Sequence, residues 1–222
     1  MSGKTQFGMA GKRKGFVLYA GLAVFLFMAY GCGGKSTSGD YAQEQGFFTD
    51  RRDGKGYRTV KLGNQTWMAK NLNFAADNSA CYDSKSGHCA KYGRLYNWNS
   101  AKGACPAGWH LPSVEEWTDM VGYVGGSSLA GKKLKSTKGW YDEYGKNNAK
   151  GNGTDNYGFS SLPGGYGHNG QFRNIGYYGY WWCSTEYDAG NASSRSMDYY
   201  NESVFKGTRE KSYLFSVRCV QD

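Results

Sequence analysis

Cys105-Pro-Ala-Gly-Trp-His-Leu-Pro-Ser-Val-Glu-Glu-Trp117 places a cysteine, a turn, a helix start and two tryptophans in one short run. Ser113 and Glu116 have the spacing of a capping box, in which each residue satisfies a free backbone N–H near the start of a helix. A helix is therefore predicted to begin at Val114. Gly125-Gly126 supplies a left-handed stop. Between these signals, apolar residues at helical spacing form a stripe that the rest of the fold must cover: Val114, Trp117, Met120, Val121 and Val124.

The composition indicates one sizeable folded domain with a tail. The chain has 222 residues, of which 39% are hydrophobic and 20% charged. The aromatic content is 17%, with 34 Gly and only 3 Pro. Large rigid side chains set among flexible turns favour short strands and long loops rather than a helical bundle.

The net charge of +9 is a weak argument for a nucleic-acid partner. Four of the positive residues, Lys4, Lys12, Arg13 and Lys14, precede Gly31, and no acidic residue does. The remaining excess is spread over a long body. We therefore expect no nucleic-acid partner.

Residues 1–31 have the pattern of a secretory signal, because the basic residues precede an apolar run from Gly15 to Gly31. The run ends at Cys32 and resembles the lipobox of bacterial lipoproteins, which implies acylation of Cys32. Ala29 and Tyr30 depart from that pattern, so ordinary signal cleavage and an uncleaved anchor stay open as alternatives. Gly33 resembles the position that follows the cysteine in lipoproteins sorted to the outer membrane. We expect an exported protein, lipid-anchored at the outer membrane or cell surface.

Residues 32–48 are mostly Gly, Ser and polar residues without periodicity, which is typical of a flexible tether. The head is expected at residues 49–222. It begins with a predicted hairpin in which residues 57–62 and 65–68 flank a Gly63-Asn64 turn. Val60 and Leu62 favour one face of its first strand as the buried one.

Cys81-Tyr-Asp-Ser-Lys-Ser-Gly-His-Cys89 reads as a polar loop closed by a local disulfide in an exported protein. A metal site using Cys81, His88 and Cys89 has poor spacing for zinc. Residues 92–101 suggest a strand that leads into a short helix. A second short helix is expected at residues 127–136, capped by Ser127 or Ser128.

From Trp140 to Gly170 regular patterning is weak, which is typical of functional loops held by a scaffold. Strand-like pieces return at residues 157–162, 179–185, 194–200 and 213–220. In the last piece Phe215, Val217 and Cys219 alternate with Ser216, Arg218 and Val220. This alternation predicts a closing strand with one buried face.

Several separated motifs resemble the Fibrobacter succinogenes major paralogous domain, from about residue 50 to the C-terminus. They are Gly63-Asn-Gln-Thr-Trp-Met-Ala-Lys-Asn-Leu72, Tyr92-Gly-Arg-Leu-Tyr-Asn-Trp98, Cys105-Pro-Ala-Gly-Trp-His-Leu-Pro-Ser113, Asn156-Tyr-Gly-Phe159, Leu162-Pro-Gly-Gly165, Tyr180-Trp-Trp-Cys-Ser-Thr-Glu186 and Ser216-Val-Arg-Cys-Val220. More distantly, residues 111–117 and 217–220 resemble the formylglycine-generating-enzyme and C-type-lectin-like superfamily. That resemblance implies a compact α+β head with two helices, a small twisted antiparallel sheet and long irregular loops on one side.

The cysteine pairing is left open by the sequence itself, because five cysteines besides Cys32 allow many arrangements. The lectin-like resemblance selects one of them. It implies that Cys105 pairs with Cys219 and Cys81 with Cys89, while Cys183 stays free.

No catalytic residue, metal or cofactor is expected. Cys183 is the one candidate for an oxidase-like enzyme, but a lone cysteine on a strand favours a buried structural thiol. The tripeptide signatures of calcium lectins are absent, and no carboxylate spacing argues for glycoside hydrolysis. His110 is interpreted as structural. The lysines at 132, 133 and 135 are interpreted as a water-facing helix surface.

Tyrosine-rich surface is the remaining functional signal. The tyrosines interleave with Gly, Asn and Ser, a composition shared with antibody paratopes, and sugar rings also stack on such side chains. The alternative is that about half of them build the core, with only their hydroxyls in water. We expect a binding module for polysaccharide or a neighbouring surface protein; the open alternatives are the Cys183 enzyme and a structural envelope protein without a ligand. The candidate surface consists of Tyr166, Tyr177, Tyr178, Tyr180, Tyr199 and Tyr200.

Overall fold

The helix expected from the capping box is present as α3 (Val114–Tyr123). Ser113 Oγ accepts a hydrogen bond from the Glu116 N–H at 3.2 Å, and the Ser113 N–H donates to Glu116 Oε2 at 2.7 Å. Beyond the helix end, Gly125 and Gly126 have φ angles of 111° and 90°, which glycine adopts without a Cβ clash. Both end signals are therefore confirmed.

The computed structural model describes residues 44–142, 144–145 and 150–222. The signal run, Cys32 and most of the expected tether lie outside the described residues. Within them, no helix is long and apolar enough to cross a membrane.

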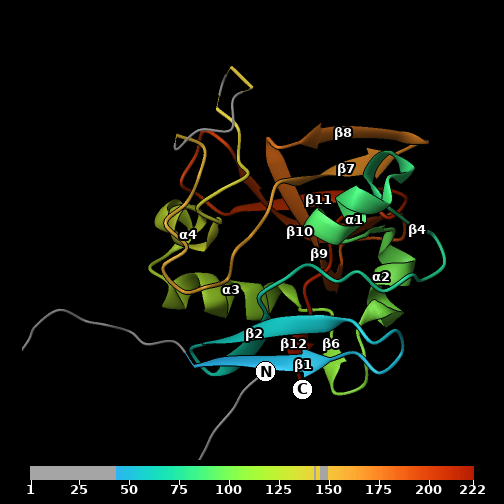
Figure 1. Ribbon diagram of the computed structural model, residues 1–222, viewed down its shortest axis with the longest axis horizontal. Helices are drawn as coiled ribbons and strands as arrows, with labels where there is room; N and C mark the ends of the chain where they lie inside the picture. Colours follow the sequence, from blue (N-terminus) through green and yellow to red (C-terminus); the bar gives the residue numbers. More distant parts are fainter. Residues whose placement is uncertain (1–43, 143, 146–149) are drawn as a thin grey trace, which may run out of the picture. The chain divides into compact units, whose positions relative to one another are not determined.

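The described chain is a mixed α+β structure with two five-stranded sheets (Figure 1). The first has the order β1 (Gln45–Thr49), β2 (Gly56–Leu62), β3 (Gln65–Met68), β12 (Val220–Gln221) and β6 (Trp109–His110). The second has the order β11 (Phe205–Glu210), β10 (Asn191–Asp198), β9 (Tyr178–Glu186), β7 (Gly164–His168) and β8 (Gln171–Ile175). β4 (Ser79–Ala80) and β5 (Leu95–Tyr96) form a small third sheet. Among these ladders, only β7–β9 is parallel.

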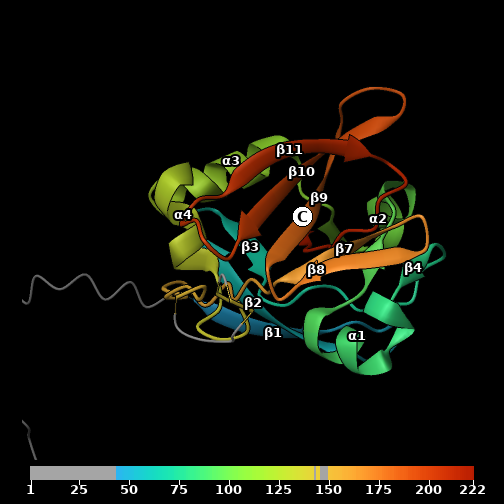
Figure 2. The same ribbon diagram turned by 90° about the horizontal axis from the view of Figure 1, so that it is seen from above.

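The described residues hold four α-helices, two more than the lectin-like resemblance implies. They are α1 (Ser86–Tyr92), α2 (Trp98–Ala104), α3 and α4 (Ser127–Leu134), with a short 3₁₀ turn, η1 (Tyr82–Ser84). The strand and short helix expected within residues 92–101 are present as β5 and α2. Seen from above, α3 and α4 lie on one side of the second sheet and α1 and α2 on the other (Figure 2). The cysteine loop is therefore largely helical, because α1 begins within it.

β9 runs between two hydrophobic clusters and supplies both. Trp181 and Cys183 enter the cluster that contains the α3 stripe, whereas Trp182 enters the cluster around Phe215. The side chains of Trp181, Trp182, Cys183 and Phe215 are at most 1% exposed. The strand predicted at residues 179–185 is confirmed, and it is buried on both faces because side chains alternate across a strand.

The closing segment differs from the prediction of one buried face. Residues 215–220 are all at most 2% exposed, including Ser216 and Arg218. Only Val220 begins a ladder strand, β12, while Phe215 and Ser216 make isolated bridges to Tyr96 and Trp181. The segment is buried on both sides because it passes between the two clusters. Residues 157–162, also predicted as a strand, form turns and a single bridge at Ser161.

The head begins earlier than expected. β1 pairs in antiparallel fashion with β2 from Gln45, and Phe48 stacks on Tyr57 and Trp109 at 5.4 and 4.8 Å. Residues 45–48, which were assigned to the tether, thus belong to the first sheet. The hairpin of β2 and β3 has the predicted turn at residues 63 and 64. β2 buries side chains from both faces, including Tyr57 as well as Val60 and Leu62.

The second predicted helix, α4, differs at both ends from the expectation. Its N-cap is Gly126 and no side chain caps it, so neither Ser127 nor Ser128 has that role. It ends at Leu134, and Lys135 turns inward. The expectation of a water-facing lysine is wrong for Lys135, which is 2% exposed and donates to the carbonyls of Asp198 and Asn201 at 2.9 Å. Burial lowers the pKa of Lys135 to about 8.

Disulfides join Cys81 to Cys89 and Cys105 to Cys219, and Cys183 is free and buried. These are the pairs implied by the lectin-like resemblance. The disulfide between Cys105 and Cys219 joins the start of residues 105–117 to the closing segment. Its large loop corresponds to about 4–5 kcal/mol of stabilisation in the chain-entropy account.

Asn71 and Arg218 form a buried polar network that joins five distant segments. Asn71 Oδ1 accepts from Arg218 Nε at 2.8 Å and from Trp181 Nε1 at 3.0 Å. Asn71 Nδ2 donates to the Tyr92 carbonyl at 2.8 Å. Arg218 also donates to the carbonyl of Phe159 and to that of Ser160 at 2.8 Å. Because Arg218 is completely buried, these acceptors replace its hydration.

We expect Asn71→Ala to lower the free energy of unfolding by about 3–5 kcal/mol, because it leaves a buried cation short of an acceptor. Urea unfolding followed by tryptophan fluorescence measures this loss. The exposed neighbour Lys70 supplies the control, since Lys70→Ala should change stability by no more than about 0.5 kcal/mol. A loss below about 1 kcal/mol for Asn71→Ala would contradict the role given to this network.

His110 links the C-terminal residue to the capping box. Its Nδ1 lies 2.6 Å from Asp222 Oδ1 and its Nε2 lies 2.7 Å from Glu116 Oε1. Partial burial alone would lower the pKa of His110, but the hydrogen bonds to Asp222 and Glu116 outweigh it and raise the pKa. The protonated ring can donate to both carboxylates at once.

Because the folded pKa is raised above the unfolded value, the stabilisation by His110 is fully present below about pH 6.5 and is lost as the pH rises through the folded pKa. We therefore expect His110→Gln to lower the urea midpoint more at pH 5.5 than at pH 8.5. Equal midpoint shifts at the two pH values would show that the charged ring does not stabilise the fold.

Candidate functional site

The six tyrosines of the candidate surface come together in the structure, although they come from distant parts of the chain. Tyr166 is on β7, Tyr178 and Tyr180 are on β9, Tyr177 precedes β9, and Tyr199 and Tyr200 follow β10. Antiparallel pairing of β9 with β10 and the contact of β7 with β9 bring these positions to neighbouring strands.

The rings form one continuous series of contacts, here named the tyrosine array. Tyr166 meets Tyr180 at 5.5 Å, Tyr180 stacks with Tyr178 at 5.8 Å, and Tyr178 meets Tyr199 at 6.2 Å. Tyr199 also contacts Tyr177 at 5.3 Å and Tyr200 at 4.9 Å. These separations suit favourable aromatic pairs. The rings thus hold one another in place.

The tyrosines divide between packing and exposure. Tyr200 is 65% exposed, whereas the other five are partly buried. Tyr180 stacks on the core residue Phe215 at 4.9 Å. Tyr166 and Tyr180 thus pack against the core, as the core alternative expects for part of the set, but none of the six residues is fully buried.

The β7–β8 hairpin next to the array was not predicted. Asn169 and Gly170 form its two-residue turn with φ angles of 48° and 72°, between the paired residues His168 and Gln171. An Asn-Gly pair with positive φ at both positions is the type I′ turn typical of hairpins. The dipeptide Asn169-Gly170 was a sequence signal for this turn. The Gly, His and Asn residues in the flanking strands obscured the alternation of apolar and polar residues that would have predicted the two strands.

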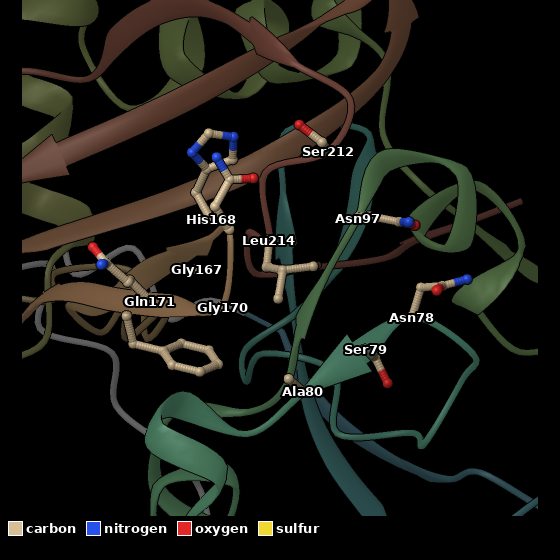
Figure 3. Close-up of a pocket in the computed structure, with 12 residues that line it drawn as sticks. Asn78, Ser79, Ala80, Asn97, Gly167, His168, Gly170, Gln171, Ser212 and Leu214 are labelled. Carbon is tan, nitrogen blue, oxygen red and sulfur yellow. The ribbon is translucent and has the colours of Figure 1, made fainter.

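One cavity lies beside this turn and has a volume of about 380 Å³; it is named the amide cavity. In Figure 3, His168 and Gln171 lie on one side of it and Asn78, Ser79 and Asn97 on the other, with Leu214 between them. Amides and hydroxyls supply both donors and acceptors. The lining therefore suits a neutral, hydroxyl-rich ligand.

A second cavity of about 380 Å³ lies between the turn and the array and is named the tyrosine cavity. Tyr166 and Tyr213 line it, and Tyr213 stacks on His168 at 3.9 Å. Tyr213 also meets Tyr166 at 5.7 Å, so it extends the array to the hairpin. The other lining residues are Asn169, Gln171 and Arg173.

Two phenols at the centre of the array, Tyr178 and Tyr180, have raised pKa values. Burial, together with the neighbouring Tyr200 and Asp198, raises the pKa of Tyr178 to about 12. Burial also raises the pKa of Tyr180, although a hydrogen bond to Asn174 opposes this rise. The phenols of Tyr178 and Tyr180 therefore remain protonated and can donate as well as accept hydrogen bonds.

Neither cavity beside the hairpin has a carboxylate in its lining. Glycoside hydrolysis needs two carboxylates across the scissile bond. Among the described residues there is also no group of three His, Cys, Asp or Glu side chains that could hold a metal ion. The arrangement can therefore bind a polar ligand, but it offers no carboxylate pair for its cleavage.

Cys183 lies away from this site, with its side chain completely buried beside Arg195. Burial raises the pKa of the Cys183 thiol to about 12, and the nearby Arg195 opposes this only in part. Thiolate is the reactive form of cysteine. The thiol is thus poorly placed for chemistry at neutral pH.

The fold and the array define a disulfide-linked α+β domain with an aromatic surface. Residues 60–221 match the Fibrobacter succinogenes major domain, and the chain belongs to this family. Neither the curated proteins nor the solved structures contain a match to this chain.

We expect Cys183 to resist alkylation in the native protein. Iodoacetamide at pH 8 should leave Cys183 unmodified in buffer and modify it fully in 8 M urea, because unfolding exposes the thiol and returns its pKa toward about 8.5. Peptide mapping distinguishes Cys183 from any free Cys32. Rapid native labelling of Cys183 would show an accessible, reactive thiol and would favour an enzyme.

Proposed function

We propose that the chain is a binding module for polysaccharide, displayed on the bacterial envelope. The observation that carries this proposal is the tyrosine array, which continues through Tyr213 to a hairpin flanked by two polar cavities. Sugar rings present apolar faces to aromatic side chains and hydroxyl groups to amides. The array and the amide cavity supply these two kinds of contact side by side.

The array is suited to binding because its rings lose little freedom when a ligand is seated. Five of the six tyrosines are already partly buried against one another or the core. A surface that is ordered beforehand avoids the entropy cost of fixing side chains on binding. Tyr178 and Tyr180 add hydroxyls that remain protonated, because burial raises the pKa of both.

The display of the module follows from the N-terminal sequence. We propose that residues 1–31 direct export, that Cys32 is acylated, and that the following residues hold the head away from the outer membrane. The finer fold proposal is a C-type-lectin-like head. The disulfide between Cys105 and Cys219, which ties the α3 region to the last strand, supports it.

A partner surface protein is the second candidate ligand. The exposure of Tyr200 favours it, because exposed tyrosines are common at protein interfaces. The oxidoreductase alternative rests on Cys183, whose burial and raised pKa weigh against it.

We expect soluble xylan or hydroxyethyl cellulose to bind the head, and Tyr200→Ala and Tyr213→Ala each to weaken binding about fivefold or more. Loss of one contact worth about 1 kcal/mol has this effect. Isothermal titration calorimetry and affinity electrophoresis measure it. Tyr187→Ala is the matched control, because Tyr187 is 69% exposed and makes no ring contact with the array among the described residues.

Equal binding by the Tyr200, Tyr213 and Tyr187 variants would place the ligand elsewhere on the head. No binding of any glycan on a broad array by the intact protein, together with capture of one envelope protein that depends on Tyr200, would favour the protein-partner alternative.

A further inference from the structure

Arg195 is a buried cation on the face of the second sheet opposite Tyr178 and Tyr180 of the tyrosine array. It is 2% exposed and pairs in register with Trp181 of β9. Its Nη2 donates to the Val114 carbonyl at 3.0 Å and to Thr118 Oγ1 at 3.3 Å, both on α3. Its Nη1 lies 3.2 Å from the Ser194 carbonyl and 4.0 Å from Cys183 Sγ.

This guanidinium has no carboxylate partner among the described residues. Its Nε–H has no hydrogen-bond partner among them. Neutral carbonyl and hydroxyl acceptors satisfy its terminal nitrogens, but they leave its positive charge without a counter-charge. Arg218 is a useful contrast, because its Nε and both terminal nitrogens each have an oxygen acceptor.

Arg195 lines a cavity of about 200 Å³ between α3, the start of α4 and β11, named the Arg195 cavity. Figure 2 shows α3 and α4 beside β10 and β11. The lining has a second cation, Lys206, two hydroxyls, from Thr118 and Ser127, and an apolar part formed mainly by Val121 and Val204. No carboxylate lines it. Glu115 and Asp119 on α3 are exposed and outside the lining.

The start of α4 adds to the positive field in this cavity. Gly126 and Ser127 both line it, and no side chain caps the helix. Uncapped N–H groups and the helix dipole favour negative charge at this end. The partial positive charge at the start of α4 thus adds to the positive charges of Arg195 and Lys206.

We propose that the Arg195 cavity binds a small carboxylate with a short apolar tail. The carboxylate is held between Arg195 and Lys206, because guanidinium and ammonium groups donate strong charge-assisted hydrogen bonds to it. The tail lies against Val121 and Val204. A cavity of 150 Å³ accommodates benzene, so the volume here suffices for a ligand of the size of butyrate.

Inorganic phosphate fits this lining less well, because it would leave the apolar part of the cavity in contact with water. A neutral molecule of the same shape would leave the two cations without a counter-charge. The two kinds of lining together therefore select for a carboxylate that carries a hydrocarbon tail. This site shares no lining residue with the polysaccharide surface, whose Tyr178 and Tyr180 lie on the other face of the sheet.

The experiment is a titration of the intact protein with sodium butyrate at constant ionic strength, followed by isothermal titration calorimetry and thermal unfolding. We expect saturable binding and a raised melting temperature with butyrate, at least fivefold weaker binding of acetate, and none of butyramide. Equal binding of butyrate and phosphate would overturn the proposal in favour of an unspecific anion site. An absence of saturable butyrate binding would overturn it altogether.

Lys206→Gln tests the location of the site, because Lys206 is exposed and its replacement should not disturb the core. We expect about fivefold weaker butyrate binding with an unchanged melting temperature in the absence of butyrate. Lys70→Gln, another exposed lysine, is the control and should bind butyrate as the original protein does. Arg195→Lys should also weaken binding, and butyrate binding that is unaffected by Lys206→Gln would place the carboxylate elsewhere.

Discussion

Arg218 is a completely buried cation, and much of the fold serves to supply it with oxygen acceptors. Its partners come from Asn71 near the first hairpin and from Phe159 and Ser160 in the long irregular segment. Removing a cation from water costs several kcal/mol, and this cost is recovered only when all acceptors are in place. The network therefore favours an all-or-none arrangement of segments that have little regular structure of their own.

The same constraint explains why the closing segment is not an ordinary half-buried strand. Arg218 points into one cluster region while Val217 and Cys219 belong to the other, so the backbone must pass between the two. Cys219 is then close enough to Cys105 for the disulfide. The family-like motif at residues 216–220 is therefore completely interior and maintains the fold. The surfaces proposed to bind ligands use other residues.

The sequence predicted correctly those elements that depend on interactions between residues close together in the chain. The Ser113–Glu116 capping box, the Gly125-Gly126 stop and the Gly63-Asn64 hairpin each act within a few residues, and each is present. The two-sided burial of residues 215–220 and the inward turn of Lys135 depend on contacts far along the chain. Composition indicated the tyrosines, but only the pairing of β7, β9 and β10 could show that their rings meet.

The period of two in β10 gives the second sheet two chemically different faces. Ser196 pairs with Tyr180 and Ser194 with Trp182, whereas Arg195 pairs with Trp181 on the opposite face. One face therefore carries neutral phenols and small hydroxyls, and the other carries a buried guanidinium under α3. A one-residue shift of this strand would place the cation among the tyrosines and would remove it from its acceptors on α3, Val114 and Thr118. Both changes would cost free energy, and this cost disfavours the shifted register.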